Sequence, residues 1–457
     1  MCLAKKCILL PFLLFLLSLN YTFAQEKIPH ISGKVIIKMQ DGLINVDLKL
    51  SNLPSLDTAF RILLNRGMNM KLIRDSSGVV KYNDTPGDDC FKYRPHDGKK
   101  YISSPKALRL SYTGAFPVYT DTLNFYDYKG VIALNGKTLR ASEQSKWYPV
   151  LYDTKNDREY TAVTYDITVE CVDCKMIYIN GSSPQKGPVA TFRSDKPYEL
   201  LLFTGDYEQQ VFSGSDFLNA GMPDDAAAAF NDQIVAIKGF YQKKLKVPYQ
   251  QKITFVQHQP IELYGPNRSW GFVTFPSIAV AGGQFNNQID MKTKKFNHMV
   301  KYSFYSHELA HYYFGNLLSP NSTLRFFFLE STAEYLSVKS AASAYGSDST
   351  RSYIKYAKKL LAAKKIVPLS QISSAEQIDD VYRYNYGPMV FLALEKRVGE
   401  DKVYKLLQNA LKHTGEKTDY TFFKTIAAES GISTQEWKDF ESQVISLTDA
   451  SLIFQYL

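Results

Sequence analysis

Short runs of alternating apolar and polar residues dominate the first half of the chain. Clusters of Gly, Pro, Asn and Asp, such as those at 85–89 and 180–183, separate these runs. Alternation with a period of two residues is typical of strands that bury one face, and such clusters are typical of turns. The clearest runs are residues 34–38, 44–50, 163–172 and 197–203. We therefore expect residues 25–215 to form an all-β sandwich or saddle.

The pattern changes after Gly214, where longer segments with helical spacing begin. Two strands are still expected, at 251–257 and 270–275. The expected helices span residues 223–245, 297–318, 327–344, 349–363, 386–398, 402–412 and 420–429. We therefore predict a second, mostly helical module at 216–457, which makes the chain a multidomain α+β protein.

One of these helices carries an apolar stripe that contains two histidines. The stripe consists of Val300, Phe304, His307, His311 and Phe314. Residues three or four positions apart share one face of a helix. We expect this face, including both imidazoles, to point toward the core.

The N-terminus has the layout of a secretory signal peptide. Lys5 and Lys6 precede an apolar run at 8–19, and a small-residue cleavage site ends at Ala24. This order predicts that residues 1–24 are a signal peptide and that the protein is exported to the periplasm, the cell surface or the medium. An uncleaved anchor is the alternative, but the run is shorter than the roughly 20 residues of a membrane span. Since no other segment is long and apolar enough, we expect no transmembrane segment.

Composition and charge exclude several classes of protein. With 45% hydrophobic and 22% charged residues, the 457-residue chain is globular and not broadly disordered. The formal net charge is +9, but the basic residues form small clusters and no single block, so we expect no nucleic-acid partner. The sequence does not indicate an oligomeric state.

Three cysteines remain after the signal peptide: Cys90, Cys171 and Cys174. The last two form a C-x-x-C motif, but they lie between two strand-like runs, whereas the redox-active motif opens a helix. We therefore favour a local disulfide or two free thiols at a hairpin turn over redox catalysis.

The candidate chemistry begins with His307-Glu308-Leu-Ala-His311. Two histidines four residues apart on a helix can both reach one cation, and zinc readily accepts neutral imidazole. Glu308 lies beside such an ion without binding it, where it can exchange a proton with the attacking water and the leaving amine. Glu330 follows inside the next helical stretch and offers an anionic oxygen. Two His and one Glu, with one position open, is the composition of a catalytic zinc site.

These residues carry a resemblance to a known family. The segment His307-Glu-Leu-Ala-His-Tyr-Tyr-Phe-Gly-Asn316 resembles the H-E-L-A-H-Q-W-F-G-N motif of the aminopeptidase-N-like gluzincin metallopeptidases, which include leukotriene hydrolase, and Leu329-Glu330 follows at the family's spacing. The resemblance implies one Zn²⁺ per chain bound by His307, His311 and Glu330, with Glu308 as general base. It also implies a peptide or protein substrate.

The resemblance further implies the overall layout of the chain. We expect a β-rich N-terminal domain followed by a thermolysin-like catalytic domain. Too few residues follow Glu330 for the large C-terminal helical domain that many relatives carry. We therefore expect a short, two-domain form of the family.

Two further residues are candidates for the site. The family has a Y-x-x-G pattern whose tyrosine donates to the developing oxyanion, and Tyr384-Asn-Tyr-Gly387 matches it, so Tyr384 is implied in that role. Tyr382 and Tyr386 are neighbouring alternatives. Glu334 lies one helical turn beyond Glu330, and we predict that it accepts the second N–H of a metal-binding histidine; a plain surface charge is the alternative.

The chain departs from the family at the segment that anchors the substrate's amino group. The family carries G-x-M-E-N, whose Glu binds the free α-ammonium. The best match here begins at Gly265 and places Arg268 at the Glu position, and a second alignment at 282–286 also lacks Glu. We list Gly265 and Arg268 as candidate substrate-binding residues, because a fixed cation there repels a free N-terminus.

Three functions stay open at this point. The first is a secreted zinc peptidase with altered recognition of the substrate end, suited to blocked or acidic N-termini or to internal bonds. The second is an ordinary aminopeptidase whose amine anchor comes from elsewhere, such as the N-terminal domain. The third is a catalytically inactive peptide-binding protein on the same scaffold. Because both histidines, Glu330 and Glu308 are all present, we favour the active enzymes.

Overall fold

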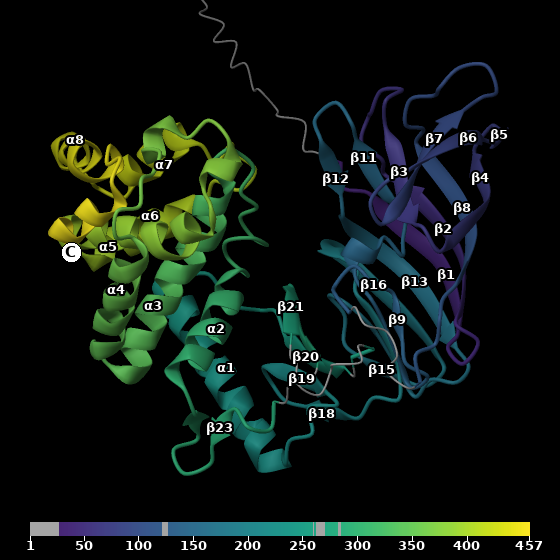
Figure 1. Ribbon diagram of the computed structural model, residues 1–457, viewed down its shortest axis with the longest axis horizontal. Coiled ribbons are helices and arrows are strands. Elements are labelled where there is room, and N and C mark those ends of the chain that lie inside the picture. The colour runs from purple at the N-terminus through teal and green to yellow at the C-terminus, as the bar shows by residue number, and fades with distance from the viewer. Residues whose placement is uncertain (1–26, 121–126, 259, 262–269, 282–284) are drawn as a thin grey trace, which may run out of the picture.

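The chain forms a β-rich N-terminal module and a mostly helical C-terminal module, with a small mixed sheet between them (Figure 1). The computed structural model describes residues 27–120, 127–258, 260–261, 270–281 and 285–457. The predicted signal peptide, 1–24, lies outside these residues. The predicted order of a β region followed by a mostly helical region is confirmed.

Three sheets build the N-terminal module. The largest has the order β16-β13-β1-β2-β8-β4-β5, in which β1 and β13 are parallel and the other pairs antiparallel. Its strands are β1 (His30–Lys38), β2 (Leu43–Ser51), β4 (Met68–Asp75), β5 (Gly78–Val79), β8 (Ala107–Ala115), β13 (Ala162–Cys171) and β16 (Val189–Glu199). The alternation predicted a half-buried strand at 44–50, and β2 buries Ile44, Val46, Leu48 and Leu50 as expected.

The other two sheets of this module have five short strands each. One, of order β15-β14-β17-β10-β9, contains β9 (Ala133–Leu134), β10 (Thr138–Ala141), β14 (Met176–Ile179), β15 (Gln185–Lys186) and β17 (Leu202–Gly205). The other, of order β12-β11-β3-β7-β6, contains β3 (Arg61–Asn65), β6 (Lys81–Pro86), β7 (Cys90–His96), β11 (Val150–Asp153) and β12 (Arg158–Tyr160). A short helical turn, η1 (Glu143–Ser145), precedes β11. The single strand expected at 197–203 is divided between β16 and β17.

A fourth sheet belongs to the start of the C-terminal module. Its order is β18-β19-β20-β22-β21, with β18 (Gln209–Val211), β19 (Ser215–Leu218), β20 (Ile253–His258), β21 (Trp270–Thr274) and β22 (Ser277–Ala281). Strand β21 is at the edge and runs antiparallel to β22. A hairpin of β23 (Ile289–Asp290) and β24 (Lys295–Phe296) follows. The domain boundary predicted between residues 215 and 216 falls inside β19.

Eight α-helices and several short helical turns complete the described part of the C-terminal module. The helices are α1 (Asp224–Leu245), α2 (Met299–Ala310), α3 (Thr332–Tyr345), α4 (Asp348–Leu360), α5 (Gly387–Val398), α6 (Glu400–Ala410), α7 (Tyr420–Glu429) and α8 (Thr434–Phe440). The turns are η3 (Phe327–Ser331), η4 (Leu369–Gln371), η5 (Ala375–Gln377), η6 (Tyr382–Tyr386), η7 (Glu441–Ile445) and η8 (Ala450–Tyr456). Of these, η3, η6 and η7 are π-helical. Helix α8 was not predicted.

Helix α2 differs from its prediction in two ways. It ends at Ala310 and not at Leu318, and a helix through Leu318 is excluded because Gly315 has φ +146°, a backbone conformation outside any right-handed helix. The predicted core stripe is also wrong at its N-terminal end: Val300 is 73% exposed and Phe304 is 42% exposed, although Phe314 is fully buried. The histidine face of α2 therefore opens toward solvent at its first turns and becomes buried only at His307.

The buried side of α2 is fixed by tyrosine hydroxyls. Tyr241 of α1 donates to the carbonyl of Ser306 (2.6 Å), and Tyr249 donates to the carbonyl of Leu309 (3.1 Å). Tyr313, just beyond α2, donates to the carbonyl of Val247 (2.8 Å). Because each bond pairs a largely buried phenol with a backbone carbonyl, they hold α2 in one orientation against α1.

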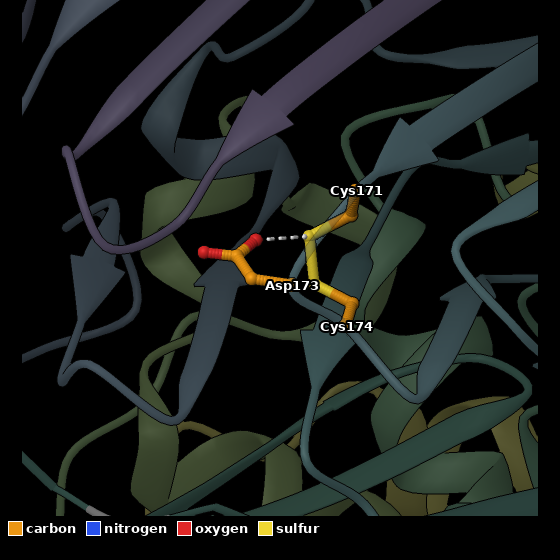
Figure 2. Close-up of side chains that lie close together, drawn as sticks. All are labelled: Cys171, Asp173 and Cys174. Carbon is orange, nitrogen blue, oxygen red and sulfur yellow. Dashed lines mark hydrogen bonds between the residues drawn. A yellow bond between two sulfur atoms is a disulfide. The ribbon is translucent and has the colours of Figure 1, made fainter.

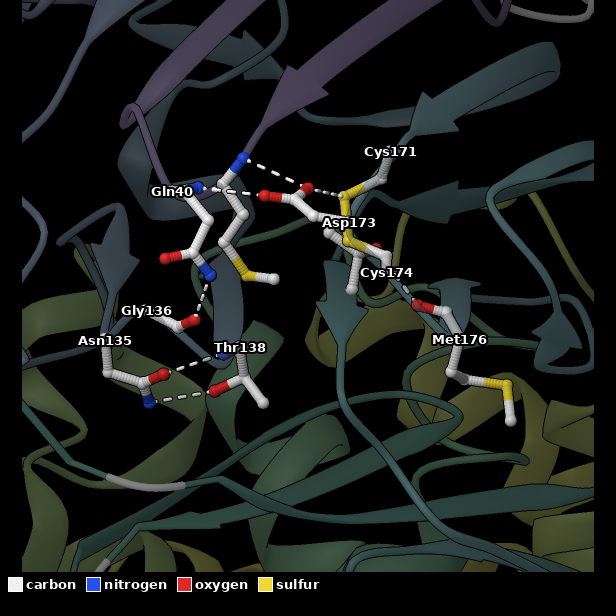
Figure 3. Close-up of a disulfide and its surroundings, with 10 residues drawn as sticks. Gln40, Asn135, Gly136, Thr138, Cys171, Asp173, Cys174 and Met176 are labelled. Atoms are coloured by element: carbon white, nitrogen blue, oxygen red, sulfur yellow. Dashed lines mark hydrogen bonds between the residues drawn. A yellow bond between two sulfur atoms is a disulfide. The ribbon is translucent and has the colours of Figure 1, made fainter.

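Cys171 and Cys174 are joined as a disulfide where β13 leads toward β14 (Figure 2). Of the alternatives, the local disulfide is therefore the one present. The Asp173 carboxylate accepts the backbone N–H groups of Gln40 (3.0 Å) and Met39 (3.4 Å), and the Gln40 side chain donates to the carbonyl of Gly136 (Figure 3). This loop thus links the β1–β2 turn to the neighbouring sheet and has a structural role.

Among the described residues, no helix combines the length and the apolar character that crossing a membrane requires.

Candidate metal centre

Three predicted ligands converge at the end of α2. The Nε2 atoms of His307 and His311 are 3.2 Å apart, and Oε2 of Glu330 lies 3.2 Å from the first and 3.5 Å from the second. Ligand atoms placed about 2.0–2.1 Å from a tetrahedral zinc ion lie about 3.3 Å from one another. The donor set of two imidazoles and one carboxylate, and its spacing, therefore fit a zinc ion.

The outer nitrogens of both imidazoles are also bonded. Nδ1 of His307 lies 2.8 Å from Oε2 of Glu334, and Nδ1 of His311 lies 3.1 Å from the carbonyl oxygen of Phe314. Because both partners are acceptors, each Nδ1 carries a proton, so an imidazole that gives up its other proton presents its Nε2 lone pair to the centre. The contact predicted for Glu334 is present, and its effect on metal binding stays a prediction.

The electrostatics of the cluster favour a cation. Burial lowers the pKa of His307, but hydrogen bonds with Glu330 and Glu334 outweigh this and raise the pKa to about 10. Burial raises the pKa of Glu330, yet the two imidazoles hold it well below its usual range. Without a metal, the cluster therefore retains a proton, so a divalent ion that binds here replaces a positive charge that the carboxylates already stabilise.

Glu308 and Tyr384 lie beside the ligands. Glu308 is half-buried, and its charge contributes to raising the pKa of both His307 and Tyr384. The Tyr384 ring centroid is 5.7 Å from that of His307, and its side chain is 37% exposed. Burial and the charge of Glu330 raise the pKa of Tyr384, so its hydroxyl keeps its proton and can donate.

The two alternative tyrosines point elsewhere. Tyr382 and Tyr386 are both buried, and their rings pack edge to face with centroids 4.9 Å apart. Tyr386 donates to the carbonyl of Val444 (3.3 Å), on the C-terminal side of the core. Of the three tyrosines, the structure brings Tyr384 to the ligand cluster.

The predicted substrate-binding residues Gly265 and Arg268 lie outside the described residues. The edge strand β21, which follows that segment, contacts a carboxylate that the sequence did not predict. Glu143, from η1 of the N-terminal module, accepts a hydrogen bond from Thr274 (3.3 Å) and is paired with Lys129 (2.5 Å). The two contact partners are distant in sequence, so no local pattern could have indicated the contact.

Comparison with known proteins agrees with this geometry. The model of the peptidase family M1 domain matches residues 229–440. The leucyl aminopeptidase of Saccharolobus solfataricus is 25% identical over 182 residues, which cover 38% of this chain and 22% of that protein. The match thus spans less than a quarter of that relative's length.

Solved structures share the fold over almost the whole chain. An M1 zinc metallopeptidase from Deinococcus radiodurans superposes with a TM-score of 0.60 at 15% identity, covering 92% of this chain and 94% of that one. A mutant of that peptidase was crystallised with a Tyr-Ser-Ala substrate and superposes with a TM-score of 0.62 at 15% identity, with the same coverage. Leukotriene A4 hydrolase from Saccharomyces cerevisiae gives 0.65 at 11% identity, covering 93% and 68%.

At these identities the structural matches establish the fold alone, while the domain match identifies the catalytic module. Both agree with the ligand cluster that the sequence motif predicted. The segment that carries His307, His311 and Glu330 therefore matches the peptidase family M1 domain, and the chain shares the fold of two-domain M1 zinc metallopeptidases.

Proposed function

We propose that this protein is an exported, zinc-dependent peptidase that hydrolyses peptide bonds at the centre formed by His307, His311 and Glu330. The observation that carries the proposal is the convergence of these ligand atoms within 4.8 Å of one another, with Glu308 and Tyr384 beside them. Export rests on the signal-like sequence of residues 1–24.

The protein's own groups have distinct tasks in this reaction. His307, His311 and Glu330 would hold a zinc ion, which would supply the Lewis acidity that activates water and polarises the scissile carbonyl. Glu308 takes a proton as water attacks and returns it to the departing amine. Tyr384 donates its hydroxyl proton in a hydrogen bond to the oxygen on which negative charge develops. Glu334 keeps His307 in the tautomer that offers Nε2 to the centre.

The substrate end is the finer part of the proposal. Arg268 at the position of the amine-binding Glu supports altered recognition, in which blocked or acidic N-termini, or internal bonds, replace the free α-ammonium. One observation bears on the alternative of an ordinary aminopeptidase: Glu143 brings a carboxylate from the N-terminal module to β21, where it is buried and paired with Lys129. The relatives named as a leucyl aminopeptidase and as a peptidase bound to Tyr-Ser-Ala also support peptide substrates.

The test is a panel of matched peptides with free and acetylated N-termini, assayed with and without a zinc chelator and again after zinc is restored. Cleavage that the chelator abolishes and zinc restores is the expected result. Preference for acetylated or internal sites supports altered recognition, whereas cleavage of free N-terminal residues alone supports the aminopeptidase. If no peptide is cleaved in a chelator-sensitive way, the protein is a binding protein and the proposal fails.

A further inference from the structure

The turn that carries Tyr384 is followed by a proline, which removes one backbone donor at the start of α5. Turn η6 is π-helical, and the N–H of Gly387 bonds to the carbonyl of Tyr382, five residues earlier. The next residue, Pro388, has no N–H. It therefore cannot serve the carbonyl of Arg383, five residues before it, or that of Tyr384, four residues before it. Both carbonyls can instead accept hydrogen bonds from side chains.

Two side-chain hydroxyls supply those donors. Ser331 Oγ, on a fully buried residue, donates to the carbonyl of Arg383 at 2.8 Å. The hydroxyl of Tyr353, from α4, donates to the carbonyl of Tyr384 at 2.5 Å. The two donors come from separate elements, so together they fix the turn from two directions.

The same contacts join the Tyr384 turn to the turn that carries Glu330. Ser331 directly follows Glu330 and ends η3, the second π-helical turn. A Cβ atom added to Gly387 would lie 2.0 Å from Ser331 Oγ, so the two turns approach each other as closely as a glycine allows. The Arg383 guanidinium also lies 3.6 Å from the centroid of the Phe326 ring, just before η3. Movement of one turn is therefore transmitted to the other.

We infer that Ser331 and Tyr353 are positioning residues for Tyr384: their hydroxyls hold the backbone on both sides of its Cα so that its phenol stays beside the metal ligands. The inference rests on the proposed function, because it concerns the oxyanion role of Tyr384. Neither hydroxyl touches substrate or metal in this role. Removing either one leaves its carbonyl to be satisfied by water or by a shift of the turn, and a displacement of about 1 Å can cost about a hundredfold in rate.

The test uses the zinc-loaded full-length protein and the best substrate from the peptide panel. Ser331→Ala and Tyr353→Phe should each lower kcat about tenfold while KM and the zinc content per chain stay unchanged. Ser349→Ala and Tyr165→Phe are the matched controls, since they remove hydroxyls that donate to the carbonyls of Gly346 and Asn180, away from Tyr384. Both controls should keep wild-type kcat.

A double-mutant cycle with Tyr384→Phe separates positioning from general structural damage. In the Tyr384→Phe background, Ser331→Ala and Tyr353→Phe should have no further effect on kcat. A further tenfold loss in that background, a loss of zinc, or an unchanged kcat in the single variants overturns the inference. If Tyr384→Phe itself leaves kcat unchanged, the oxyanion role fails instead, and that outcome is distinguished because the single variants are measured independently. Thermal unfolding of each variant verifies that it is folded.

Discussion

Helix α2 and the pair of turns η3 and η6 contribute to the same site but are built by different means. At the end of α2, where His311 follows the helix and keeps a right-handed helical backbone conformation, the four-residue spacing places His307 and His311 side by side. Glu330 and Tyr384 lie 54 residues apart in the sequence, on separate turns, and their proximity depends on hydroxyl–carbonyl bonds and on a close glycine contact. One half of the site is therefore set by local geometry and the other by tertiary packing.

The difference indicates where each half is vulnerable. A helix keeps the spacing of its histidines as long as it stays helical. The hydroxyls of Tyr241 and Tyr249 fix only the orientation of α2. The π-helical turns have no comparable internal constraint, since their wider hydrogen bonding leaves carbonyls for other groups to satisfy. We expect changes in α2 to act on metal binding and changes around η6 to act on turnover.

The largest effect should come from breaking the α2 half. His307→Ala removes a ligand, so zinc should no longer copurify at one ion per chain and activity should fall on the order of a thousandfold or more. Metal analysis and kcat/KM measure both. His413→Ala is the control, because His413 also lies between two carboxylates, Glu416 (2.7 Å) and Glu429 (2.8 Å), outside the cluster. Retention of stoichiometric zinc by His307→Ala would contradict the ligand assignment.

A substitution in the η6 half of the site should lower turnover and leave metal binding unchanged. Tyr384→Phe removes the donor to the developing oxyanion, so kcat should fall about 100- to 1,000-fold with zinc content and KM nearly unchanged. Steady-state kinetics with parallel metal analysis make the measurement. An equal fall in zinc content would show that the two halves are not separable in the way proposed.

A smaller effect is expected one contact away from the metal. Glu334→Ala removes the carboxylate that holds Nδ1 of His307, so zinc affinity should weaken about 10- to 100-fold. Competition with a chelator of known affinity measures the change, and Glu334→Gln, which keeps an acceptor oxygen, should lose less. Glu429→Ala, at His413, serves as the control. Unchanged zinc affinity in Glu334→Ala would mean that Glu334 is a plain surface charge with no role in metal binding.

The smallest effect concerns the stability of the protein and a buried lysine of α1. Lys238 is buried beneath the carbonyls of Gly214 and Gln251, and burial lowers its pKa to about 7 from 10.5. Between pH 7 and about 10.5 the native lysine is neutral while the unfolded one is protonated, so unfolding takes up a proton. The Lys238 contribution to the free energy of unfolding should therefore rise with pH, by at most about 1.4 kcal/mol per unit.

Denaturant titrations from pH 7 to 10 provide the measurement. Subtracting the Lys238→Met curve from the wild-type curve should reveal this slope, while the exposed Lys243→Met on the same helix should show none. A flat difference curve would mean that Lys238 stays charged in the folded protein. In Lys238→Met, the carbonyls of Gly214 and Gln251 lose their donor. This loss should change the free energy of unfolding by the same amount at every pH, so it does not change the slope.

The same division explains what the sequence could predict. The His307–His311 pair was predictable because a helix converts sequence spacing directly into spatial proximity, and the β strands were predictable from their alternation. The C-terminal end of α2 was overextended because the backbone conformation of Gly315 is not encoded in the apolar pattern. Val300 and Phe304 were misplaced because a helix that lines a solvent-facing site can carry apolar residues there.

No local pattern in the sequence indicates the tertiary contacts around the site. Ser331, Tyr353 and Glu143 act on residues far from them in the chain, and each is an ordinary side chain in its own segment. Tyr384 was selected only through a resemblance, since Tyr382 and Tyr386 have the same chemistry. Their burial, which separates them from Tyr384, depends on the packing of the completed core.

The most direct test of the account is Glu308→Gln, because Glu308 lies beside the ligands and is proposed to move protons without binding metal. We expect one zinc per chain, unchanged thermal unfolding, and hydrolysis of the best peptide reduced by about 100- to 10,000-fold. Zinc content and single-turnover rate should be measured on the same preparation. Substantial residual hydrolysis with full zinc occupancy would contradict the central claim that this centre is a zinc peptidase with Glu308 as its base.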